Sequence, residues 1–301
     1  MQNAEPVQLR QVRDLGQIIA TTFTFMRQNK RMFRHALFIA LPFMLVGSVL
    51  MNYVPLALQG DAMDRLHSGP FGPAFNTSAS IVAYSTGLVM TLIGFTLLMA
   101  SIHEYIRAYY LGESHLLTTG ELFSRCWSQF GHYLALGFLM PLVVTICFIL
   151  CILPGLFVGP ILCLSLAAHA IERSGGFGSW SRSSNLVMSD FWATLGLFLL
   201  MWIIWYIVNI VLQLPFLLVG GGIGFATGFE MMQEPGVVQE GAGKIVKFFS
   251  WFQVVAGILQ SITYVFTMPI VCVSMCLKYF SRVEEKEAHG LRERIAGFDQ
   301  V

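Results

Sequence analysis

The sequence is poor in charge and lacks the marks of a soluble enzyme. Only 12% of its 301 residues are Asp, Glu, Lys or Arg, whereas 55% are hydrophobic. Soluble domains carry about 25% charged residues, so this composition excludes an ordinary soluble fold. A Walker A loop, a dinucleotide-binding glycine motif and a nucleophile elbow are all absent. The net charge of +1 gives no electrostatic reason to expect nucleic acid as a partner.

We expect neither a removable signal peptide nor a disulfide framework in this sequence. Its first thirty residues are polar and basic, without a short apolar core or a small-residue cleavage site, so we expect the first apolar run to be a retained anchor. None of the six cysteines lies in an expected outward loop. Cys147/Cys151 and Cys272/Cys276 have the spacing of one helix face. Copper(I) would suit these thiols, but small residues that pack helices are the interpretation we favour, so we predict no metal and no cofactor.

Six aromatic-rich apolar runs are present. They begin near Phe33, Ser80, Tyr133, Leu156, Phe191 and Lys247. About 20 apolar residues span a hydrocarbon core of about 30 Å, and the backbone inside it must form its hydrogen bonds within the run, as a helix. We therefore predict an all-α polytopic integral membrane protein with six transmembrane helices. A single membrane domain would then comprise an N-terminal segment (1–32), a six-span bundle (33–277) and a tail (278–301).

Basic residues indicate the orientation of this bundle. Fifteen of the 18 lysines and arginines fall on one side of the six-run pattern, and only Arg65, Lys244 and Lys247 fall on the other. By the positive-inside rule, both termini are cytoplasmic. We expect a bacterial inner membrane protein with outward breaks at 59–76, at a tight turn over 153–155 and at 213–243. Pro215 and the glycines after it leave two alternatives for 213–229, a re-entrant segment or the end of a long tilted helix with its loop.

An amphipathic segment precedes every second run. The first has apolar residues at helical spacing from Leu15 to Met26. The second has a potential capping box, Thr118 with Glu121, followed by the apolar face Leu122, Phe123, Cys126, Trp127 and Phe130. In the third we expect Trp180, Ser184, Val187 and Phe191 to share a face. Such segments lie in the membrane interface, and their recurrence suggests a threefold helix-hairpin repeat, although any apolar helices can be aligned in this way.

The stretch from Glu172 to Trp192 carries a resemblance to a known family. Its pattern of Glu172, Gly175, Ser179, Arg182, Ser183 and Leu186 before Phe191-Trp192 is similar to a stretch in the membrane domain attached to some bacterial glycerophosphodiester phosphodiesterases and in related uncharacterised membrane proteins. The sequence departs from the family at Ser184 and Asn185. Because the family's catalytic activity belongs to a soluble barrel that this chain lacks, the resemblance implies a membrane architecture without that activity.

Polar residues inside the runs supply two weak candidate sites. His103, Glu104 and Arg107, together with His169, Glu172 and Arg173, lie at two expected inner helix ends. They suit a metal or proton-relay site, or a membrane-embedded lipid enzyme, but ion pairs between helix ends are the interpretation we favour. Deep amides suit either a polar solute path or hydrogen bonds that hold helices together, which we favour. These amides are Asn52, Asn209, Gln213, Gln253 and Gln260.

A third set of residues is predicted to contact lipid at the interface. It contains Arg182, Glu172, Phe191, Trp192, Arg125 and Trp127. The planar guanidinium of Arg182 can pair with a lipid phosphate or with a carboxylate such as Glu172, and so fix the third amphipathic segment against the headgroups. A simple positive-inside charge is the alternative.

These observations predict a non-enzymatic accessory or scaffold protein. It would act through membrane lipids, other membrane subunits or a second copy of itself, with no nucleic acid. The alternative is a permease or channel for a small or lipid-like solute, whose path would include Asn52, Asn209, Gln213 and Gln260.

Overall fold

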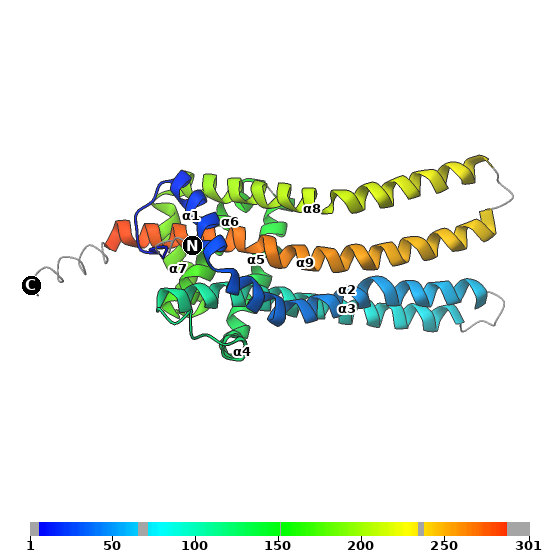
Figure 1. Cartoon of the computed structure of the whole chain (residues 1–301), viewed down its shortest axis with the longest axis horizontal. Coiled ribbons are helices and arrows are strands. Elements are labelled where there is room, and N and C mark those ends of the chain that lie inside the picture. The colour runs from blue at the N-terminus through cyan, green and yellow to red at the C-terminus, as the bar shows by residue number, and fades with distance from the viewer. Residues whose placement is uncertain (1–5, 66–71, 151, 234–237, 288–301) are drawn as a thin grey trace, which may run out of the picture. The chain divides into compact units, whose positions relative to one another are not determined.

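The computed structural model describes residues 6–65, 72–150, 152–233 and 238–287, and the regular secondary structure in these ranges is helical. Nine α-helices follow one another in these ranges (Figure 1). They are α1 (Leu15–Gln28), α2 (Lys30–Arg65), α3 (Gly72–Tyr110), α4 (Thr119–Ser128), α5 (Phe130–Leu150), α6 (Ile152–Glu172), α7 (Gly176–Met188), α8 (Phe191–Gln233) and α9 (Val238–Glu287). The predicted all-α class is confirmed.

The described residues divide into two units. Unit 1 draws on Met1–Ile39, Thr96–Tyr206 and Thr267–Val301, and unit 2 consists of Ala40–Phe95 and Ile207–Phe266. Helices α1, α4, α5, α6 and α7 belong to unit 1, whereas α2, α3, α8 and α9 contribute to both units. Each site discussed below is built within one unit.

Four helical stretches in the described ranges are long and apolar enough to cross a membrane. These stretches are Lys30–Asn52, Ile81–Tyr110, Phe191–Phe216 and Phe252–Glu287. A fifth apolar stretch, Phe157–Glu172, is shorter. The four long stretches are those of a multi-pass membrane protein.

The connections between the long helices are shorter than expected from the sequence. Helix α2 continues to Arg65 and α3 begins at Gly72, so most of the loop expected at 59–76 is helical. Helix α8 passes through Pro215 to Gln233, and α9 begins at Val238, so the break expected at 213–243 is largely helical too. Of the two alternatives for 213–229, the structure has the long helix. The intervening residues 66–71 and 234–237 lie outside the described ranges.

The turn expected at 153–155 is instead the start of a helix. Because α6 begins at Ile152, Leu153, Pro154 and Gly155 form its first turn. Proline is tolerated in a first helical turn, where the missing N–H has no helical acceptor. Helix α5 ends at Leu150, and Cys151 lies outside the described ranges.

Glycines allow α2 and α3 to pack closely in unit 2. A Cβ atom on Gly94 would lie 2.9 Å from the backbone nitrogen of Met44, and one on Gly87 would lie 2.8 Å from that of Met51. From the other side, a Cβ on Gly47 would lie 2.7 Å from the backbone nitrogen of Thr91. These three positions bring two backbones together, as small residues do in membrane helix pairs.

The three short amphipathic helices are present as predicted. Helix α1 begins with a capping box between Asp14 and Gln17, and α4 begins with the predicted box between Thr118 and Glu121. The backbone and hydroxyl groups of Thr118 lower the pKa of Glu121 by hydrogen bonding to its carboxylate. Helix α7 begins after Gly175. Each helix buries one narrow stripe, such as Ile18, Thr22 and Phe25 in α1.

Candidate functional site

A buried ion pair lies at the centre of the candidate site in unit 1. The carboxylate of Glu104, on α3, has no exposed side-chain surface. Arg173 donates to it through both terminal nitrogens, at 2.8 Å to Oε1 and 2.7 Å to Oε2. The hydroxyl of Tyr133, on α5, donates to Oε1 at 3.0 Å. One carboxylate thus links α3, α5 and the turn after α6, and the ion-pair interpretation of these helix ends is confirmed at Glu104.

The backbone at Arg173 is placed in an uncommon conformation to make this contact. Arg173 follows the last residue of α6, and its φ of 55° lies in the left-handed region. Its N–H still donates to the carbonyl of His169 at 3.0 Å. Glycine is the usual residue at such a helix end, because a side chain there costs about 1 kcal/mol or more. The bidentate ion pair with Glu104 offsets that cost.

Three histidines lie around the ion pair. The Nδ1 atoms of His103 and His169 each lie 2.8 Å from a backbone carbonyl, that of Met99 and of Ser174 respectively. Because a carbonyl only accepts, both rings carry the proton on Nδ1 and keep Nε2 as an acceptor. The ring of His132 stacks on that of His169 at 4.9 Å, and the ring of Tyr133 meets His169 edge-on at 5.3 Å.

This cluster brings together His103 and Glu104 from one of the two expected helix ends and His169 from the other. In the part of the chain that the structure describes, no group of three or more His, Cys, Asp or Glu residues could hold a metal ion. Cys126, on α4, is buried close to Glu104, and burial raises the pKa of its thiol. Cys126 is therefore held as a neutral thiol, which is the unreactive form.

The two cysteine pairs, for which copper(I) was the alternative to helix packing, differ in how far the structure describes them. Cys272 and Cys276 are free and buried, and Cys272 contacts the sulfur of Met99 at 3.4 Å. The side chains of Cys147 and Cys151 lie outside the described part of the chain. Buried neutral thiols on helix faces fit the packing role that the sequence favoured.

A second polar network joins α7 to the end of α9. Arg182 donates through Nε to Glu172 at 3.0 Å and through Nη2 to Glu287. The hydroxyl of Tyr279 donates to the same oxygen of Glu172. Burial alone would lower the pKa of Arg182, but hydrogen bonds and charge from Glu287 and Glu172 raise it above its usual value. Arg182 thus bridges two carboxylates from different helices.

The connection between α7 and α8 extends this network. Lys278 donates to Asp190 at 2.8 Å, and Arg282 lies 3.5 Å from the same carboxylate oxygen. Arg282 also donates to the hydroxyl of Ser189 at 2.7 Å. The side chains of Lys278 and Arg282 are 5% and 8% exposed, so these cations belong to the interior of unit 1. We call the contacts of Arg182, Asp190, Lys278 and Arg282 the α7–α9 clamp.

The predicted interface residues are either half-buried or exposed. The ring of Phe191 stacks on that of Phe157 at 4.3 Å, whereas Trp192 is 79% exposed. Arg125 pairs with Glu113 at 2.9 Å on the surface. Trp127 is exposed between Phe123 and Phe130, at ring distances of 6.0 and 5.3 Å. Only Trp127 and Trp192 of these aromatic residues present much apolar surface.

The face predicted for α7 is divided between the interior, at Val187, and the surface, at Trp180. The helix buries Ser179, Ser183, Leu186 and Val187, and the hydroxyl of Ser183 donates to the carbonyl of Ile161. Trp180 instead lies on the exposed side. Small serines allow α7 to approach α6 closely, an advantage that hydrophobic periodicity does not register. The exposed side carries its own apolar stripe, formed by Phe177, Trp180, Met188 and, on α8, Trp192.

Three of the predicted path amides lie near one stretch of α9 in unit 2. The side chains of Gln213 and Gln260 are hydrogen-bonded to each other. Asn52 donates to the carbonyl of Ser48 at 2.8 Å, and its Nδ2 lies 3.1 Å from where a Cβ of Gly257 would be. Asn209 is buried one helical turn before Gln213. Gln213–Gln260 is the interhelical amide bond that the sequence favoured.

Sequence reasoning missed several members of both networks. Tyr133 was assigned only as the start of an apolar run, and Lys278 and Arg282 only as basic residues after the last span. The one available signal was the presence of polar residues on otherwise apolar helix ends. A sequence pattern does not reveal which of them meet.

Comparisons with protein-family models, curated proteins and solved structures find no match for this chain. The resemblance carried by residues 172–192 therefore stays a prediction.

Removing either partner of the buried ion pair should destabilise the protein strongly. We expect Glu104→Gln and Arg173→Gly each to lower the free energy of unfolding by about 3–5 kcal/mol, because each leaves the partner's charge without compensation. Arg173→Gly is the sharper test, since it also relieves the left-handed backbone. The double variant should lose less than the sum of the two single losses. Denaturant unfolding in detergent measures these values.

The exposed Arg125–Glu113 pair provides the matched control. Arg125→Gln removes the same kind of contact at the surface and should cost less than about 1 kcal/mol. Equal losses for Arg125→Gln and Arg173→Gly would show that burial does not set the strength of the inner pair.

Replacing Arg182 should loosen α7. We expect Arg182→Ala to speed amide hydrogen exchange across residues 176–188, and Arg182→Lys to have an intermediate effect, because lysine keeps the charge but cannot bridge Glu172 and Glu287. Arg182 and its partners Glu172 and Glu287 are partly exposed, so the loss should be about 1 kcal/mol or less. Exchange followed by mass spectrometry measures it. An effect confined to bilayers of anionic lipid would assign Arg182 to headgroup contact instead.

Proposed function

We propose that this protein is a non-enzymatic multi-pass membrane scaffold that works through its lipid-facing or partner-facing helix surfaces. The observation that carries the proposal is the pair of exposed aromatic surfaces on α4 and α7. Trp127 and Phe123 on α4 are 54% and 37% exposed, and Phe177 on α7 is 94% exposed. Apolar side chains exposed beside a polar network are typical of residues at a membrane boundary.

The double-sided character of α4 and α7 supports this proposal. Each helix buries one stripe in unit 1 and leaves a second apolar stripe uncovered, and Trp180, Met188 and Trp192 continue the second stripe of α7. An interfacial helix is expected to behave in this way, since one face holds it to the protein and the other enters the headgroup region.

The ion pairs of the acidic residues also favour a scaffold over an enzyme. Glu104, Glu172 and Asp190 each already pair with a basic side chain of the same chain. A general acid or base has to exchange protons with a substrate, and a carboxylate held by an arginine fork is poorly placed for that task. Carboxylates that pair with basic side chains of the same chain are typical of a structural role.

A permease or channel is the second candidate. Its support is the grouping of Gln213, Gln260 and Asn52 near Gly257 in unit 2, since a row of amides is how a path for a polar solute is lined. The hydrogen bond between Gln213 and Gln260 argues against a permease or channel, because it occupies amide groups that would otherwise face a solute.

For the topology, we propose six spans with both termini in the cytoplasm. Helices α5 and α6 have 21 residues each, about the length that crosses a hydrocarbon core. In a cysteine-free background, single cysteines placed within 61–75, within 230–243 and at Leu150 should react with an impermeant thiol reagent added from outside. A Leu150→Cys variant that reacts only from inside, or not at all, would favour four spans instead.

Reconstitution distinguishes the two candidate functions. In proteoliposomes, a scaffold should move neither glycerol, followed by light scattering, nor a fluorescent phospholipid, followed by quenching with dithionite, faster than protein-free liposomes do. The alternative would be established by a flux that Gln260→Leu abolishes. Ser261→Ala is the matched control, because it removes a polar group of the adjacent residue that bonds only its own helix, at Gly257.

A further inference from the structure

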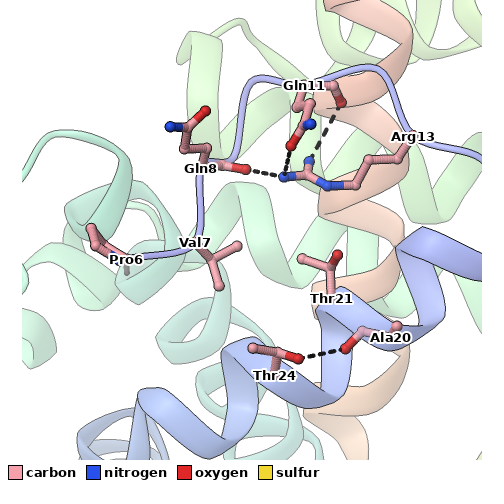
Figure 2. Close-up of a pocket in the computed structure, with 8 residues that line it drawn as sticks. All are labelled: Pro6, Val7, Gln8, Gln11, Arg13, Ala20, Thr21 and Thr24. Atoms are coloured by element: carbon pink, nitrogen blue, oxygen red, sulfur yellow. Dashed lines mark hydrogen bonds between the residues drawn. The ribbon is translucent and has the colours of Figure 1, made fainter. Parts of the chain in front are cut away.

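A cavity that is open to the surface lies between the N-terminal segment and helix α1, all within unit 1. Its volume is about 630 Å³, and it is lined by residues of the segment 6–13 and by Ala20, Thr21 and Thr24 of α1 (Figure 2). This volume falls in the range of about 300–1,000 Å³ that small-molecule sites occupy.

The segment that forms one wall of the cavity is attached to two other helices. The carbonyl of Val7 accepts from the hydroxyl of Tyr109 at 3.2 Å, and the guanidinium of Arg10 lies over the ring of Tyr110 at 4.9 Å. The backbone N–H of Arg13 donates to the hydroxyl of Ser281 on α9 at 3.0 Å. The wall is thus part of the folded unit and defines a pre-formed cavity.

Arg13 is the one strongly charged group of this lining, and its hydrogen bonds go to neutral acceptors. Nη1 donates to the carbonyl of Leu9 at 3.0 Å. It also donates to the carbonyl of Gln11 at 3.4 Å, and Nη2 donates to the carbonyl of Gln8 and to Oε1 of Gln11 at 3.1 Å (Figure 2). Among the described residues, no carboxylate forms an ion pair with Arg13, and Nε has no acceptor. Burial without a counter-charge lowers the pKa of Arg13, although the guanidinium stays protonated.

Three other arginines of unit 1 have the carboxylate partner that Arg13 lacks. Arg173 pairs with Glu104, Arg182 with Glu172 and Arg282 with Asp190. An anion in the cavity would complete the same arrangement at Arg13. Further donors lie beside it. Because Oε1 of Gln11 accepts from Arg13, the amide NH₂ of Gln11 is directed elsewhere, and no described residue bonds the hydroxyl of Thr21.

We propose that this cavity binds a phosphate group, carried by a phospholipid headgroup or by free phosphate. The Nε–H of Arg13, the hydroxyl of Thr21 and the amide of Gln11 would donate to phosphate oxygens, which only accept. The cavity is larger than one phosphate, and Pro6, Val7 and Ala20 offer apolar contacts to an organic substituent. The site also lies close in sequence to a stretch that could cross a membrane, because α1 ends at Gln28 and the apolar stretch of α2 begins at Lys30. The site does not depend on the proposed scaffold function.

Calorimetric titration of the full chain in a neutral detergent tests the site. The probes are dihexanoyl phosphatidic acid, inorganic phosphate and dihexanoylglycerol, which lacks the phosphate. The phosphatidic acid should bind saturably and dihexanoylglycerol should not. Arg13→Gln should weaken binding about tenfold or more, because it removes a charged hydrogen-bond donor. Arg27→Gln removes the same charge from the exposed last turn of α1 and should change binding by less than about twofold.

Arg13→Gln could also lose binding because the N-terminal segment unfolds, since Arg13 bonds the backbone of that segment. A second variant separates this effect from the loss of the binding site. Ala20→Phe places a phenyl ring in the cavity and changes none of the groups that bond Arg13, and it should also abolish saturable binding. Inorganic phosphate that binds as tightly as the lipid, with the same dependence on Arg13, would assign free phosphate as the ligand. Much tighter binding of the phosphatidic acid would assign the headgroup. Retained binding in Ala20→Phe, or equal losses in Arg13→Gln and Arg27→Gln, would overturn the proposal.

Discussion

The arrangement of unit 1 depends on the buried carboxylate of Glu104. A buried charge costs several kcal/mol unless ion pairs and hydrogen bonds compensate it. Here a bidentate arginine and a tyrosine supply that compensation at 2.7–3.0 Å. These partners come from α5 and from the turn after α6. The hydrogen bonds of one α3 side chain therefore hold the start of α5 and the end of α6 in place. The ion pair with Glu104 also compensates for the left-handed backbone conformation of Arg173.

Pairing of charges between distant segments also holds the α7–α9 clamp together. Asp190 lies between α7 and α8, and Lys278 and Arg282 reach it from the interior of unit 1. The contacts of Arg182 add the end of α6 and the end of α9. Charges close to apolar helix ends are thus used in pairs, each pair joining segments that are distant in sequence. Arg13 departs from this pattern, since the segment around it supplies neutral acceptors only.

The short amphipathic helices connect this interior to the surroundings. Each has a buried stripe that is narrower than its apolar face, so part of the apolar surface stays uncovered. On α4 the predicted face divides between buried Leu122 and Cys126 and exposed Phe123 and Trp127. On α7 the buried stripe is half serine, and the aromatic residues lie on the other side. Hydrophobic periodicity locates such helices well, but it does not decide which of two apolar stripes meets the protein.

The sequence by itself determined the all-α class, the long apolar helices, the three short amphipathic helices and the capping box at Thr118. These features depend on residues a few positions apart, where composition and helical spacing are sufficient. Only the tertiary structure decided that Arg173 meets Glu104, that α8 continues through Pro215, that α7 buries its serines, and that Arg13 lines a cavity without a carboxylate. Each of these outcomes depends on which distant segment supplies a missing charge, hydrogen-bond partner or packing surface, and a linear pattern does not carry that information.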